Sequence, residues 1–101
     1  MRTRKDANHA EIKAALYEAH LDVIDLSDVP ANLPELANLP DLLVGGFHQK
    51  YGIPYAVLME VKTETGNVKD GQSSFARDWR GPVAIVRNVK EALAQFGIEV
   101  D

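Results

Sequence analysis

The chain has no cysteine, so disulfides, iron–sulfur clusters and cysteine-type zinc sites are excluded. Its three histidines lack the spacing of a metal-binding motif. No apolar run approaches the ~18 residues of a membrane span. The charged first residues lead into Asn8 and His9, not into the apolar core of a signal peptide. We therefore expect a cytoplasmic protein that is neither exported nor embedded in a membrane.

Lysine and arginine are absent from residues 14–49, a stretch that holds six acidic residues. All 11 basic residues lie in the rest of the chain beside nine acids, so that part carries +2 while the whole chain carries −4. The overall acidity therefore does not exclude a nucleic-acid partner. The acidic stretch is either a solvated surface, a face turned away from a polyanion, or a protein contact.

A length of 101 residues allows one domain and no second core. An apolar content of 46% with 26% charged residues is ordinary for a globular protein and excludes a mostly disordered chain. We expect a single domain over residues 1–101. Residues 1–7 form a basic arm in which Arg4 and Lys5 either contact phosphates or belong to a solvated tail.

Hydrophobic periodicity predicts a mixed α/β domain in the order α-β-β-β-α-β-α with a short final strand. The first helix would begin at Asn8 as N-cap, with Glu11 completing a capping box. Phe75 and Trp79 lie at helical spacing and are predicted in the core, with base stacking as the lesser alternative. The expected helices are 8–20, 69–80 and 89–96, the expected strands 21–26, 42–47, 55–62, 83–87 and 98–100, and a loop with a helical turn at 35–38 fills 27–40.

Two short segments carry the residues of chemical interest: Pro40-Asp41 and, 19 residues after Asp41, Glu60-Val61-Lys62. Residues i and i+2 of a strand share a face, so Glu60 and Lys62 project together. Asp41 begins the strand that pairs with theirs. Neighbouring carboxylates repel unless a cation lies between them. Mg²⁺, or Mn²⁺ in its place, prefers such oxygen ligands, and the Val61 carbonyl is a further candidate.

This set of groups suits phosphodiester hydrolysis. A metal polarises the phosphoryl group and lowers the pKa of bound water, while Lys62 orients that water or stabilises the developing negative charge. Glu11 lies next to the apolar stripe of the first helix and can complete the metal site. Gln72 lies on the first turn of the second helix, where its amide can bond a catalytic side chain or the DNA backbone.

The order of these residues resembles the P-D…(D/E)-x-K nuclease superfamily. More closely, the sequence resembles the small virus-type replication-repair nuclease domains (VRR-NUC) and, more distantly, archaeal-type Holliday junction resolvases. The resemblance covers nearly the whole chain and rests on Glu11, Pro-Asp-Leu-Leu at 40–43, Leu-Met-Glu-Val-Lys-Thr at 58–63, Gln72 and the segment 81–89. The chain departs from the family at 37–39, where a basic residue and glycine usually stand, and its segment 27–39 is long.

The resemblance implies a restriction-endonuclease-like core in which Glu11, Asp41 and Glu60 are metal ligands, Lys62 is the catalytic lysine and Gln72 the motif glutamine. It also implies a homodimer that cuts branched DNA in a bacterial or phage-infected cell. The second helix begins at the predicted site, so Lys69, Arg77 and Arg80 are the best candidates for phosphate contacts. The alternative functions are a non-catalytic DNA-binding module with the same fold, and a protein-interaction domain.

Overall fold

The computed structural model describes residues 7–28 and 38–100. Its elements are α1 (His9–Glu18), β1 (Asp22–Asp25), β2 (Leu42–Phe47), β3 (Pro54–Val61), α2 (Asp70–Asp78), β4 (Val83–Val86) and α3 (Val89–Ala94). The predicted α/β order is thus confirmed, except for its last strand. The predicted helical turn at 35–38 lies outside the described residues, apart from Asn38.

Residues 98–100 form no strand, so that prediction is wrong. The chain turns at Gly97, whose φ of 72° is the left-handed conformation that glycine adopts without strain. The amide of Ile98 then donates to the carbonyl of Leu93 over 3.1 Å. Ile98 therefore closes the end of α3 and packs against the core instead of extending the sheet.

The four strands form one mixed sheet in the order β1-β2-β3-β4. The β1–β2 and β2–β3 pairs are antiparallel, and β3 and β4 are parallel. The predicted hairpin over 42–62 and the crossover through the second helix are therefore confirmed. β3 is a central strand, as its apolar sequence predicts.

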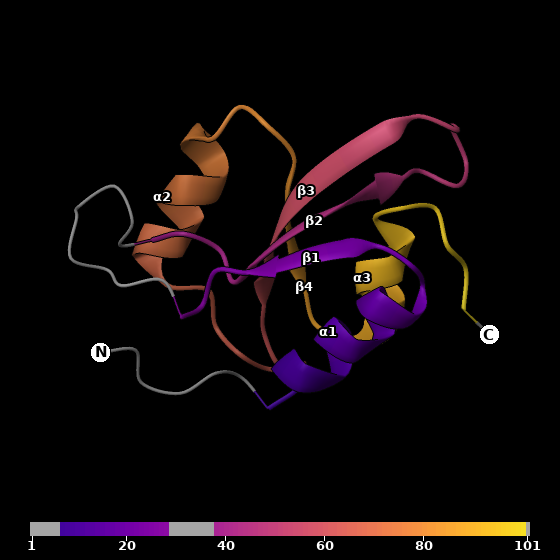
Figure 1. Cartoon of the computed structure of the whole chain (residues 1–101). Helices are drawn as coiled ribbons and strands as arrows, with labels where there is room; N and C mark the ends of the chain where they lie inside the picture. The colour runs from indigo at the N-terminus through magenta and orange to yellow at the C-terminus, as the bar shows by residue number, and fades with distance from the viewer. Residues whose placement is uncertain (1–6, 29–37, 101) are drawn as a thin grey trace.

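Helices α1 and α3 lie together and cover one face of this sheet (Figure 1). Alternate strand residues point to that face and form the core with side chains of the two helices. The buried apolar residues are Ile12, Leu16, Leu21, Leu42, Val44, Val57, Met59, Val61, Val86, Ala92, Leu93 and Phe96. None of the helices in residues 7–28 and 38–100 is long and apolar enough to cross a membrane.

Helix α2 stands apart from α1 and α3 (Figure 1) and contains no buried residue. The prediction that Phe75 and Trp79 lie in the core is therefore wrong. The two rings stack on each other with centroids 5.5 Å apart, and Trp79 is 50% exposed. Between Asp70 and Asp78 only Phe75 and Ala76 add apolar side chains, which is too little apolar surface to bury a helix.

Asp25, at the end of β1, ties that strand to α1. Its carboxylate accepts hydrogen bonds from the Ser27 amide at 2.9 Å, from the Ser27 hydroxyl and from Lys13 Nζ at 2.9 Å. Burial by itself raises the pKa of Asp25, but these hydrogen bonds outweigh it and hold the pKa well below its usual range. The same contact raises the pKa of Lys13.

Replacing Asp25 by asparagine is expected to destabilise the fold by about 1.5–3 kcal/mol at pH 7, the usual value of hydrogen bonds to a charged group. The lowered pKa means that the ionised form stabilises the fold fully above the unfolded pKa of about 4 and progressively less below it. Urea unfolding at several pH values measures this contribution. The difference in the free energy of unfolding between wild type and variant should become smaller below about pH 4. A difference that does not depend on pH would contradict this assignment.

Candidate functional site

Three charged residues are buried where the carboxyl end of β3 meets the start of β2. Asp41, Glu60 and Lys62 are 7%, 5% and 8% exposed. Removing charges from water costs several kcal/mol per ion unless they are paired, hydrogen-bonded or bound to a cation. The burial of three such groups at one place therefore marks this end of the sheet as the candidate site.

Asp41 is held on both sides by neighbouring strands. Its carbonyl accepts a hydrogen bond from the Leu26 amide over 2.7 Å. Its Oδ2 accepts one from the Val61 amide over 2.9 Å. Leu42 pairs with Met59, so Asp41 stands opposite Glu60, one step farther along the two strands. The two segments that are 19 residues apart in the sequence therefore meet in space, as predicted.

The carbonyl of Val61 is directed to the same edge of β3. The amide and carbonyl of one strand residue point to the same side, because together they form its paired hydrogen bonds. The Val61 amide donates to Asp41 on the β2 side of the strand, so the Val61 carbonyl also points to the β2 side. Asp41, Glu60 and Val61 thus present oxygen atoms at one end of the sheet.

Glu60 and Lys62 project to the same side of β3, opposite to Met59 and Val61, which face the core. Lys62 Nζ lies 3.7 Å from Glu60 Oε2, and the two side chains are only 10% and 7% exposed. Lys62 is also fixed through its backbone, because its amide donates to the carbonyl of Val86 over 3.0 Å. The ammonium group is therefore held beside the Glu60 carboxylate.

Gln72 connects α2 to this site through both ends of its amide. Its Nε2 donates to Glu60 Oε2 over 2.7 Å. Its Oε1 accepts from the Lys69 amide over 3.1 Å, so the side chain also caps the start of α2. The sequence predicted a bond from the Gln72 amide to a side chain of the site or to the DNA backbone, and in the structure the amide bonds the Glu60 side chain.

Asn8 occupies the N-cap position of α1, as predicted, but its side chain makes no capping hydrogen bond, so the predicted capping box with Glu11 is wrong. Its Nδ2 instead donates to the carbonyls of Lys62 at 2.9 Å and Arg87 at 2.7 Å. Lys62 and Arg87 directly follow β3 and β4. The Asn8 amide therefore links the ends of these two strands at Lys62. The sequence contains no signal for this role, because the acceptors are backbone groups 54 and 79 residues away.

Arg87 was also missed by the sequence analysis. Its Nη1 donates to the carbonyls of Thr63 at 2.7 Å and Gly66 at 2.8 Å. In addition, Asn88 Nδ2 donates to Glu64 Oε1 at 2.9 Å. The loop that follows Lys62 is thereby fixed to the end of β4.

Replacing Asn8 by alanine leaves two carbonyls without their shared donor. We expect a loss of about 1–3 kcal/mol in the free energy of unfolding by urea. Asn67→Ala, at an exposed position of the loop before α2, is the matched control. Equal stability of Asn8→Ala and Asn67→Ala would contradict this role.

The other predicted residues lie outside this cluster. Glu11 is exposed on the first turn of α1. No group of three or more His, Asp or Glu side chains in the described part of the chain is arranged to hold a metal, so Glu11 is not assembled with Asp41 and Glu60. Lys69, Arg77 and Arg80 are exposed on or beside α2. Arg4 and Lys5 are outside the described residues.

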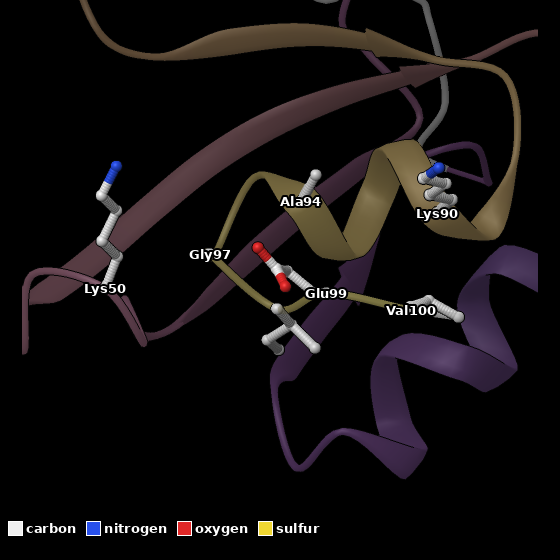
Figure 2. Close-up of a pocket in the computed structure, with 7 residues that line it drawn as sticks. Lys50, Lys90, Ala94, Gly97, Glu99 and Val100 are labelled. Atoms are coloured by element: carbon white, nitrogen blue, oxygen red, sulfur yellow. The ribbon is translucent and has the colours of Figure 1, made fainter.

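A shallow pocket lies at the opposite end of the sheet, between the β2–β3 turn and the end of α3. Figure 2 shows Lys50 and Lys90 on either side of Glu99 in this pocket. Its other lining residues are Ala94, Gly97, Ile98 and Val100. It offers a single carboxylate, and the lysines are not held by buried acids, so it lacks the features of the site at Asp41 and Glu60.

The oxygen donors at that site fit a hard divalent cation. Mg²⁺ typically takes one or two carboxylates and completes its shell with water and substrate oxygens. Asp41, Glu60 and the Val61 carbonyl supply that kind of set without a third acidic residue. Comparison with known protein families, with curated proteins and with solved structures finds no match to the chain.

Proposed function

We propose that the chain is a divalent-metal-dependent DNA endonuclease with the restriction-endonuclease-like core of the P-D…(D/E)-x-K superfamily. One observation carries the proposal: the hydrogen bond from the Val61 amide to Asp41 Oδ2, which joins the Pro-Asp and Glu-Val-Lys segments. Neither segment is distinctive alone. Their meeting at one end of a sheet, with all three charges buried, is costly for a purely structural role.

In the proposed site Asp41, Glu60 and the Val61 carbonyl hold the metal, Mg²⁺ or Mn²⁺. When bound, the metal supplies Lewis acidity toward the phosphodiester and lowers the pKa of the attacking water. Lys62 donates to that water or to the phosphate oxygens as negative charge develops. Gln72 orients Glu60 through the bond to its Oε2. Hydrolysis adds water across one P–O bond of the backbone.

The proposed substrate is branched DNA, and the proposed active form is a homodimer. A domain of this size has room for one site, whereas resolving a four-way junction needs two symmetric cuts, which a twofold dimer supplies. Sedimentation at micromolar concentration should show a dimer. A monomer that still cuts both strands of a junction in one encounter would contradict the dimer.

Cleavage of labelled four-way junction, flap, linear duplex and single-stranded DNA tests the proposal. Each substrate is incubated with Mg²⁺, with Mn²⁺ or with EDTA. We expect cutting with either metal, none with EDTA, and the highest rate on a branched substrate. Metal-independent DNA binding without cutting would instead indicate a binding module. Neither cutting nor binding would indicate a protein-interaction domain.

A further inference from the structure

Helix α2 and the residue that follows it carry an aromatic pair that the fold leaves accessible. The rings of Phe75 and Trp79 stack at an angle of 13° with centroids 5.5 Å apart. Half of Trp79 remains exposed. A Cβ atom at Gly81 would come within 2.7 Å of Trp79 Nε1, so the glycine lets the backbone run against the indole edge. The indole is thus supported by Phe75 and Gly81 while much of its surface faces solvent.

The segment that carries this pair has a small excess of positive charge. Residues 69–80 hold three basic residues, Lys69, Arg77 and Arg80, against two acidic ones. Arg77 Nε contacts Asp78 Oδ1 over 3.1 Å, but both side chains are more than 70% exposed. Such exposed ion pairs are weak, so a phosphate can displace Asp78 from Arg77.

The part of the chain that forms α1 and β1 has the opposite charge. Residues 7–28 contain one lysine and five acidic residues. Helix α2 stands apart from α1 (Figure 1). A polyanion is therefore repelled from the α1–β1 side and attracted to the α2 side, which makes the charge of the aromatic surface complementary to DNA.

The aromatic pair is connected to the candidate site through its own helix. Gln72, which bonds Glu60, precedes Trp79 by seven residues. At a helical rise of 1.5 Å per residue, that separation is about 10 Å along the axis. This corresponds to about three nucleotides at the spacing of a stacked strand.

We propose that Trp79 and Phe75 form a stacking platform for an unpaired base of the DNA strand that is cut, with Arg77 and Arg80 binding the phosphates beside it. The inference rests on the proposed nuclease function and deepens it, because it names the substrate class. A base can stack on the indole only where it is unpaired. The substrate therefore has nucleotides about three positions from the cleaved bond that are unpaired or that open at a branch point, and fully paired linear duplex is a poor substrate.

The fluorescence of Trp79 tests this platform directly, because it is the sole tryptophan of the chain. The full chain is titrated in EDTA with a single-stranded oligothymidine of about 16 nucleotides, and separately with a hairpin-closed duplex. We expect quenching by the single strand and little by the duplex. No quenching by the single strand would overturn the proposal.

Anisotropy of the same oligonucleotide, labelled with fluorescein, compares variants. Trp79→Ala should weaken binding by about 5- to 150-fold, the range for the loss of one stacked base, and Trp79→Phe should retain most of the affinity. The matched control is Tyr17→Ala, because Tyr17 is 52% exposed on the acidic side and should not matter. Equal losses in Trp79→Ala and Tyr17→Ala would overturn the platform.

Cleavage separates this inference from the proposed function. Metal-dependent cutting that is unchanged in Trp79→Ala, both in rate and in preference for unpaired substrates, overturns the platform and leaves the nuclease intact. Quenching by the single strand without cutting of any substrate supports the platform and removes the nuclease. Quenching by a protein partner but by neither DNA would assign the surface to protein contact and overturn the proposal.

Discussion

Replacing Lys62 by methionine is expected to lower the rate of metal-dependent DNA cleavage by about 10²–10³-fold, the usual cost of removing one charge-stabilising donor. Lys62 is the buried cation of the site, with Nζ 3.7 Å from Glu60 Oε2. Methionine is unbranched and apolar, so it fits the buried position. Glu60 keeps its hydrogen bond from Gln72 in this variant. The measurement is the single-turnover rate on the best substrate at saturating Mg²⁺.

The matched control is Lys90→Met, because Lys90 is exposed on α3, away from the site. It should cleave at the wild-type rate. Circular dichroism and metal affinity should be close to wild type in both variants, which separates loss of the ammonium from loss of the fold. A Lys62→Met protein that is folded, binds metal and cleaves at the wild-type rate would remove Lys62 from the mechanism.

Replacing Asp41 by asparagine is expected to weaken divalent-metal binding by at least about 10- to 100-fold, the cost of losing even a residue that only orients a ligand. Asparagine retains an oxygen that can accept the hydrogen bond from the Val61 amide. The contact between the start of β2 and the end of β3 is therefore kept. What is lost is one of the two negative charges that attract the cation. Calorimetric titration with Mn²⁺ measures the change.

Asp22→Asn is the control for this change, because Asp22 is an exposed carboxylate on β1. It removes the same charge from the chain without touching the site, and should bind metal as the wild type does. An Asp41→Asn protein with wild-type metal affinity would contradict the assignment of Asp41. Equal weakening in both variants would show that only the net charge matters.

The sheet and the meeting of Asp41 with Glu60 and Lys62 were predictable because they follow from local rules. A period of two places Glu60 and Lys62 on one side of a strand. The hairpin over 42–62 brings Asp41 opposite Glu60, as the pairing of Leu42 with Met59 shows. An apolar run before Glu60 indicates that the strand is central, and therefore that its charges are buried.

The errors arose where a local pattern has more than one physical outcome. The side chain of an asparagine before a helix usually accepts a hydrogen bond from the first turn of that helix. The Asn8 side chain instead donates to two carbonyls at the ends of strands. Phe75 and Trp79 have the spacing of a buried stripe, yet they stack on each other over a helix with little apolar surface. Glu11 is next to the buried residues His9, Ile12 and Leu16 on the surface of α1, but its own side chain points to solvent.

The central claim is that the end of the sheet at Asp41 and Glu60 hydrolyses DNA with the help of a divalent metal. The most direct test is the single-turnover rate of cleavage of a labelled four-way junction by the wild-type chain as Mg²⁺ is raised from zero. We predict no cutting in EDTA and a rate that rises with Mg²⁺ to a plateau. Cleavage that persists in EDTA, or no cleavage with Mg²⁺ or Mn²⁺, would contradict the claim.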